Sequence, residues 1–122
     1  MTADDDTLSA AAEPLPVTVL AADSLGRLPR LRVQPGYEAL AGFLESDLQG
    51  GLSGIARLLA DLGRVERGEL EGLERTGNAY RLTLRNGEAR LHLLEGPETS
   101  GCRIDALLFR RCVEAWQTAL RS

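Results

Sequence analysis

Few side chains in this sequence could carry out catalysis near neutral pH. His92 is the only histidine, and Cys102 and Cys112 are the only cysteines. A general base or an activated thiol needs a partner group held beside it, and no spacing in the chain predicts such a partner. The paired cysteines that are typical of zinc sites are also missing. We therefore expect no enzyme activity, no catalytic residue, no bound metal and no cofactor.

The glycine-rich segment from Gly50 to Gly54 fits neither of two catalytic or nucleotide-binding motifs that it superficially resembles. A P-loop requires a Gly-Lys pair followed by Ser or Thr, and the protein contains no lysine. A nucleophile elbow requires glycine two residues after Ser53, where Ile55 stands. The segment instead predicts an irregular start to a short helix.

The side chains best suited to bind a partner lie on a predicted β-hairpin over residues 80–94. Asn86-Gly87 supplies the two positive-φ positions of a type I′ turn, so counting outward from it fixes the strand register. The predicted pairs are Arg85–Glu88, Leu84–Ala89, Thr83–Arg90, Leu82–Leu91, Arg81–His92 and Tyr80–Leu93. Side chains alternate between the faces of a strand, so one face is apolar and the other polar.

The polar face of this hairpin is the predicted surface for contact with another protein, because arginine is enriched at interface hot spots. Its basic members are Arg81, Arg85, Arg90 and His92. Binding of single-stranded nucleic acid would need aromatic rings for base stacking, and Tyr80 points to the opposite face. Glu88 also lies among the arginines, so nucleic acid is the less favoured partner.

A second predicted contact region is the stretch over residues 64–76, in which acidic residues alternate with arginines. Its acidic members are Glu66, Glu69, Glu71 and Glu74. We expect this stretch to extend the contact surface for the protein partner.

The hairpin belongs to a predicted α+β domain, with an antiparallel sheet of about four to six strands covered on one face by two helices. Short strands are predicted at 17–21 and 30–34, and another over about 70–76. Apolar residues at helical spacing predict helices at 52–62 and 105–120, with Gly63 ending the first. A loop is predicted before the second helix, with Cys102 in it. Residues 37–45 fit both a strand and a helix, and the strand is slightly favoured.

The acidity of the chain is concentrated near its N-terminus. The net charge is −4, and all 14 basic residues are arginine, which together with abundant Leu, Ala and Gly indicates a GC-rich bacterial genome. Residues 1–16 carry Asp4–Asp6 and Glu13 and predict a disordered acidic tail. Residues 17–122 then predict a single domain of nearly balanced charge.

No apolar run approaches the roughly 20 residues that a membrane-spanning helix needs. The N-terminus also lacks the basic and apolar regions of a signal peptide. We therefore expect a cytoplasmic protein without membrane contact, in which both cysteines are reduced.

The order of elements resembles that of compact α+β immunity proteins, which neutralise toxins of contact-dependent and polymorphic toxin systems. The likeness spans about residues 28–120: short strands, a Leu-rich helix ending at Gly63, the segment Arg75-Thr-Gly-Asn-Ala-Tyr-Arg-Leu-Thr-Leu with its Asn-Gly hairpin, and a C-terminal helix with Trp116. It implies an inhibitor that covers the active site of a cognate toxin and performs no chemistry. Two alternatives stay open, namely a chaperone of a secreted effector and an RNA- or ribosome-associated accessory protein.

Overall fold

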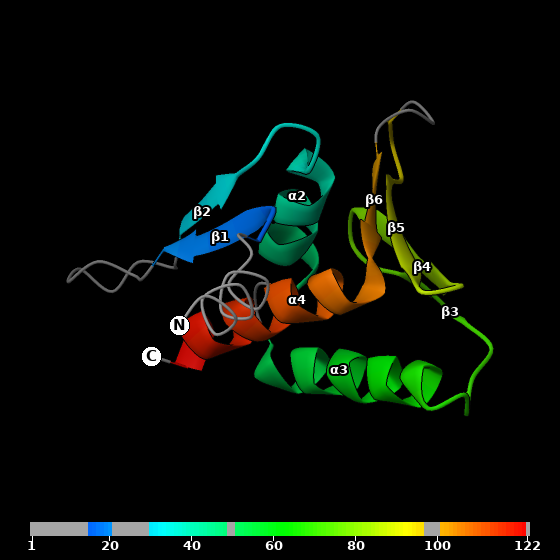
Figure 1. Ribbon diagram of the computed structural model, residues 1–122. Coiled ribbons are helices and arrows are strands. Elements are labelled where there is room, and N and C mark those ends of the chain that lie inside the picture. The colour runs from blue at the N-terminus through cyan, green and yellow to red at the C-terminus, as the bar shows by residue number, and fades with distance from the viewer. Residues whose placement is uncertain (1–14, 21–29, 49–50, 97–100, 122) are drawn as a thin grey trace, which may run out of the picture.

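The computed structural model describes residues 15–20, 30–48, 51–96 and 101–121 of the chain. These residues form an α+β fold with a four-stranded antiparallel sheet, a two-stranded antiparallel sheet and three helices (Figure 1). The elements are, in order, β1 Val17–Leu20, β2 Arg30–Val33, α2 Glu38–Asp47, α3 Leu52–Glu66, β3 Leu73–Thr76, β4 Tyr80–Arg85, β5 Glu88–Leu93, β6 Gly101–Asp105 and α4 Ala106–Arg121. The predicted α+β class is confirmed.

The predicted hairpin forms the centre of the larger sheet, whose strand order is β3-β4-β5-β6. All six predicted residue pairs, from Tyr80–Leu93 to Arg85–Glu88, are present. Asn86 has φ of 53° and Gly87 has φ of 74°, as a type I′ turn requires. The apolar face of the hairpin is core, since Leu82, Leu84, Ala89 and Leu91 are buried.

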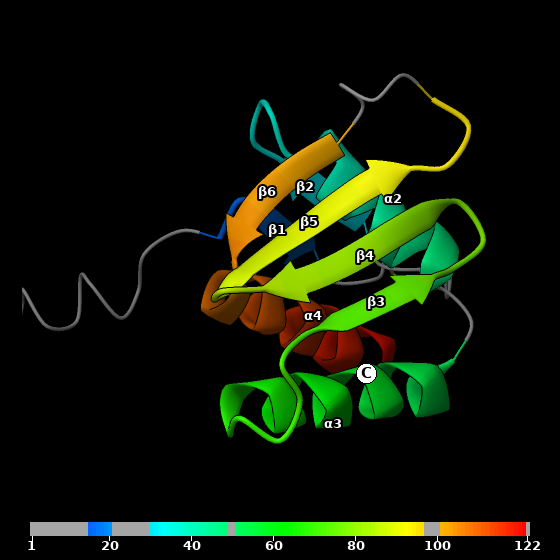
Figure 2. The same ribbon diagram turned by 90° about the vertical axis from the view of Figure 1, so that its right-hand side faces the viewer.

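One face of this sheet is covered by helices and the other is open. In Figure 1 the sheet is seen from its side, with α2, α4 and the β1-β2 pair all on one side of it. Figure 2 looks onto the opposite face, and no described element lies in front of it. The helix α3 runs beside α4, along the β3 edge of the sheet.

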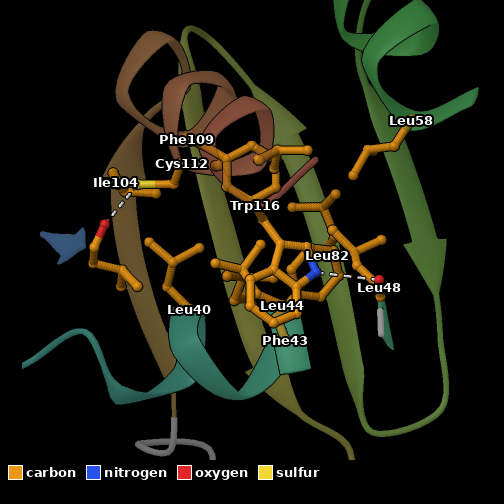
Figure 3. Close-up of a cluster of buried hydrophobic side chains, with 14 of the residues drawn as sticks. Leu40, Phe43, Leu44, Leu48, Leu58, Leu82, Ile104, Phe109, Cys112 and Trp116 are labelled. Carbon is orange, nitrogen blue, oxygen red and sulfur yellow. Dashed lines mark hydrogen bonds between the residues drawn. The ribbon is translucent and has the colours of Figure 1, made fainter. Parts of the chain in front are cut away.

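The helix α2 corrects the preference for a strand over residues 37–45. Its buried side chains, Leu40, Ala41, Phe43 and Leu44, are spaced to line one side of a helix that packs on the sheet. Contacts with the distant α4 hold it there. The ring centroids of Phe43 and Phe109 are 5.9 Å apart (Figure 3). Only the tertiary packing distinguishes a helix from a strand in this short segment.

The strand β6 corrects a second prediction, because Cys102 lies in a strand and not in a loop. Residues 101–105 pair antiparallel with β5 and so occupy an edge that β5 would otherwise leave unpaired. The following helix begins at Ala106, one residue later than predicted. At the other predicted helix, α3 continues through Gly63 to Glu66.

The remaining predicted strands are close to their predicted positions. β1 and β2 pair with each other, from Val17–Val33 to Leu20–Arg30, and form the separate two-stranded sheet. β3 pairs with β4 as the first strand of the larger sheet. Of the predicted acidic tail, only Leu15 and Pro16 belong to the described residues, and the backbone N–H of Gln34 donates to the Pro16 carbonyl at 2.9 Å.

A single cluster of buried side chains joins both sheets and the helices. Trp116 and Phe109 of α4 are the largest of its fully buried side chains (Figure 3). The Trp116 indole N–H donates to the Leu48 carbonyl oxygen at 3.2 Å, so the polar atom of this buried ring is satisfied. Val17 of β1 is also fully buried in this cluster.

Candidate functional site

The surface that carries most of the predicted contact residues is the uncovered side of the four-stranded sheet, which we call the open face (Figure 2). The strand register places on it Glu74, Thr76, Arg81, Thr83, Arg85, Glu88, Arg90, His92, Gly101, Arg103 and Asp105. The opposite side of the same strands carries the buried leucines, so the open face is the solvent-exposed side of a sheet that is covered on its other face.

The four predicted basic residues of the hairpin lie together on the open face. Arg81 is directly opposite His92, and Arg90 is the next basic residue along β5. Among the described residues, no carboxylate lies within ion-pair distance of Arg81 or Arg85, whereas Arg90 Nε lies 2.7 Å from Glu88 Oε1. The common placement of these residues is confirmed, and their contact with a partner stays a prediction.

Arg103 is a further basic residue of the open face, and it was missed because the residues just before the predicted helix at 105–120 were predicted to be a loop. It lies directly opposite Arg90 in the β5–β6 ladder and is exposed. The alternation of inward Cys102 and Ile104 with outward Arg103 and Asp105 is the signal that could have revealed the strand.

The four predicted acidic residues do not form one surface. Only Glu74 lies on the open face, opposite Thr83. The Glu66 carboxylate accepts hydrogen bonds from Nε and Nη2 of Arg110, each at 2.9 Å, and so ties α3 to α4. Glu71 is exposed in the connection that leads to β3.

Glu69 is held by a local ion pair at the end of α3. Its carboxylate accepts a hydrogen bond from Arg67 Nε at 2.6 Å, and Arg64 Nε lies 3.7 Å away. The hydrogen bond and the charge of Arg67 lower the pKa of Glu69. Two of the four acids, Glu66 and Glu69, therefore already have arginine partners within the chain.

The open face is hollowed where β5 and β6 lie side by side, and we call this depression the β5–β6 hollow. It has a volume of about 600 Å³ and is lined by Thr83, Arg90, Leu91, His92, Gly101, Cys102 and Arg103. A Cβ atom at Gly101 would collide with the Leu91 carbonyl oxygen, so only glycine fits there. Gly101 stands opposite His92, so the backbone of β6 has no side chain over it beside the imidazole ring.

A second depression on the open face lies nearer the hairpin turn. It has a volume of about 240 Å³ and is lined by Thr83, Arg85, Asn86, Glu88 and Arg90. Arg90 and Thr83 border both depressions, so the two are neighbours on one surface. Arginine is the prevailing charged residue around them.

A third depression, of about 190 Å³, lies between α2, α3 and the end of β3. The one carboxylate that borders it is held by hydrogen bonds within the fold. The Asp47 carboxylate accepts hydrogen bonds from the backbone N–H of Ala79 at 3.0 Å and of Tyr80 at 3.2 Å. The Ser46 hydroxyl also donates to it at 3.0 Å. This arrangement fixes the end of α2 to the start of β4.

Neither thiol of the described residues is activated for nucleophilic chemistry. Burial raises the pKa of Cys102, and it raises the pKa of Cys112 to about 11. A protonated thiol is a poor nucleophile and a poor metal ligand. Within the described ranges, no three His, Cys, Asp or Glu side chains gather in a way that could hold a metal ion.

Comparisons with protein-family models, with curated proteins and with solved structures found no match to this chain. In the part of the chain that the structure describes, no helix is both long and apolar enough to cross a membrane.

Proposed function

We propose that this protein binds another protein through the open face and acts in the cytoplasm as an immunity-type inhibitor, neutralising a cognate bacterial toxin by covering its active site. The observation that carries this proposal is a sheet face with exposed arginines, Arg81, Arg85 and Arg103, that lack carboxylate partners among the described residues. Inhibition by occlusion requires a rigid complementary surface and no chemistry.

The chemistry of arginine favours a protein partner that presents carboxylates. A guanidinium group forms paired hydrogen bonds with a carboxylate, and it is less strongly hydrated than an ammonium group. It therefore loses less on desolvation when an interface closes over it. Arg81 and Arg85 are free of such pairing within the described residues and are exposed, so they can pair with carboxylates of a partner.

The rigidity of the open face also favours tight binding. The strands that carry it are anchored from behind by fully buried side chains such as Leu82 and Leu91. Binding to a preformed surface avoids the entropy that ordering a flexible loop would cost. The face therefore meets its partner without rearrangement of the backbone.

The size of the open face sets how it must be tested. Four short strands about 4.8 Å apart cover roughly 300 Å². A standard interface buries about 800 Å² on each partner, so adjoining segments must also contribute. In an interface of this size a single truncated side chain removes few contacts. Reversing the charge of two arginines is a sharper test, because the new carboxylates also repel the carboxylates of the partner.

The arginines also give some support to a second candidate, an RNA- or ribosome-associated accessory protein. Arg81, Arg90 and Arg103 could contact phosphates. Among the described residues, however, His92 is the only side chain of the open face with a ring on which a base could stack. Phosphate binding would weaken steeply with salt, which separates the two candidates experimentally.

The test uses the whole chain, tagged, to capture its partner from the native bacterium at low and at high salt. The captured protein is expected to be toxic when it is expressed alone and harmless when it is expressed with this chain. The double variant Arg81→Glu with Arg85→Glu should lose both capture and protection. The matched control, Arg32→Glu with Arg57→Glu, makes the same charge change at exposed arginines outside the open face and should keep both.

Two results would count against the proposal. Full protection by the double variant at 81 and 85 would exclude the open face as the contact surface. Capture of RNA or ribosomal proteins that wash off at high salt would favour the accessory-protein candidate.

A further inference from the structure

The β5–β6 ladder contains an arrangement that the fold alone does not require. Arg90 and Arg103 are direct cross-strand partners on the open face. Like charges directly opposite each other destabilise a sheet. Among the described residues, Arg103 has no carboxylate within ion-pair distance, and the partner of Arg90 is Glu88 of its own strand. An acidic residue in place of Arg103 would face Arg90 across the ladder as an opposite charge.

The nearest acidic residue of β6 does not relieve this repulsion, because it serves the following helix. The Asp105 carboxylate accepts hydrogen bonds from the backbone N–H groups of Leu107 at 3.0 Å and Leu108 at 3.3 Å. It thereby caps the first turn of α4. The guanidinium group of Arg103 is left to face the β5–β6 hollow, whose lining it shares with Arg90 and His92.

We propose that the β5–β6 hollow binds an acidic segment of the protein partner, with a carboxylate held between Arg90 and Arg103. This inference rests on the proposed function, and it adds Arg103 as a contact residue and acidic side chains as the chemistry of the partner. Two guanidinium groups that repel each other in the free protein attract a carboxylate placed between them. A carboxylate at this position offsets the like charges of the Arg90–Arg103 pair.

The shape of the hollow agrees with a peptide segment as its occupant. Its volume of about 600 Å³ is within the range of ligand sites and exceeds what a single small ion needs. Gly101 is exposed and carries no side chain, so a main chain can approach the backbone of β6 there. Thr83 adds a hydroxyl group on the side of β4.

The charge pattern around the hollow favours an acidic peptide over a nucleic acid. Glu74, Glu88 and Asp105 share the open face with the arginines. A nucleic-acid strand carries a phosphate at every nucleotide and would bring some of them close to these carboxylates. An acidic segment of a protein can place carboxylates at the hollow and uncharged residues beside Glu74, Glu88 and Asp105, so it avoids that repulsion.

The first measurement is fluorescence anisotropy of a labelled, capped hexaglutamate peptide with the whole chain in about 50 mM salt. We expect saturable binding by the unaltered chain and no binding of capped hexaglutamine. Arg103→Glu should weaken hexaglutamate binding at least tenfold, and Arg90→Glu should do the same. Arg32→Glu changes the net charge equally on β2 and should alter binding less than twofold.

Thermal unfolding of the same variants separates lost binding from lost folding. Arg103→Glu replaces a like-charge pair by an opposite-charge pair, so its melting temperature should equal or exceed that of the unaltered chain. Arg103→Gln, which only removes the charge, provides a second variant with the same expected loss of binding. A binding loss that accompanies an equal or higher melting temperature supports the proposal.

The proposal is overturned if Arg103→Glu and Arg103→Gln bind hexaglutamate as well as the unaltered chain, or if Arg32→Glu weakens binding as much. Tighter binding of a six-nucleotide thymidine oligonucleotide than of hexaglutamate would overturn the choice of an acidic peptide. With the captured partner, loss of binding in the 81 and 85 double variant but not in Arg103→Glu would reject the hollow and keep the proposed function. The reverse result would keep the hollow and reject the wider contact surface.

Discussion

At the scale of the residue, Cys112 links burial to pH dependence. It is fully buried, and desolvation raises its pKa to about 11 from an ordinary value of 9.0. The unfolded chain therefore releases this proton at lower pH than the folded chain does. The contribution of Cys112 to the free energy of unfolding is fully present below about pH 9 and is lost as the pH rises towards about 11.

As the pH rises from 8.5 to 10.5, the free energy of unfolding should fall in the unaltered chain, and in Cys112→Ala it should fall by roughly 2 kcal/mol less. Urea unfolding followed by circular dichroism at several pH values measures this slope. Cys102→Ala is the matched control, because that thiol is only partly buried and should change the slope less. Parallel curves for the unaltered chain and Cys112→Ala would reject the buried thiol as the cause.

Trp116 combines a large buried ring with a single polar contact. Trp116→Phe removes the N–H that donates to the Leu48 carbonyl and leaves space where the larger ring was. We expect a loss of about 2–4 kcal/mol in the free energy of unfolding, measured by urea titration. Leu107→Ala on the same helix is the control, since Leu107 is 61% exposed and its truncation should cost little. Similar losses in the two variants would contradict this account.

At the scale of the element, the junction between β6 and α4 depends on one side chain. Asp105 ends the strand and caps the helix through Leu107 and Leu108. Asp105→Ala should lower the free energy of unfolding by about 1 kcal/mol, whereas Asp105→Asn keeps a capping oxygen and should lower it much less. Thermal unfolding of both variants measures the difference, and an equal loss in both would show that capping is not the cause.

At the scale of the whole molecule, the two-stranded sheet shares the core of the four-stranded sheet. Val17 of β1 is fully buried, and its carbonyl lies 4.0 Å from the Cys112 sulfur of α4. Val17→Ala should therefore destabilise the whole domain by about 2 kcal/mol. We expect Trp116 fluorescence and far-ultraviolet circular dichroism to shift to the same lower midpoint, as one cooperative unit requires.

The control for this prediction is Thr18→Ala, the exposed neighbour on the same strand, which should leave the midpoint nearly unchanged. A shift in circular dichroism without a matching shift in Trp116 fluorescence would mean that β1 and β2 unfold separately. The prediction of a single domain over residues 17–122 would then be wrong.

The sequence by itself determined the elements whose signals are local. Asn86-Gly87 and the alternation around it were enough to predict every pair of the β4–β5 hairpin and the face on which Arg81, Arg85 and Arg90 lie. The apolar stripe of α4, including Trp116, was equally readable. In both cases the period of the backbone decides which side chains share a face, and that period is a property of the local chain.

Only the tertiary structure decided the features that depend on pairing between distant segments. Residues 38–47 form a helix because their apolar side can pack on the sheet and α4, and residues 101–105 form a strand because β5 offers them an edge. Strand pairing placed Arg103 opposite Arg90 and Glu74 on the open face, whereas Glu66 lies at the end of α3 and binds Arg110 of α4. Short segments fit more than one local structure, so the contacts available from distant parts of the chain select among them.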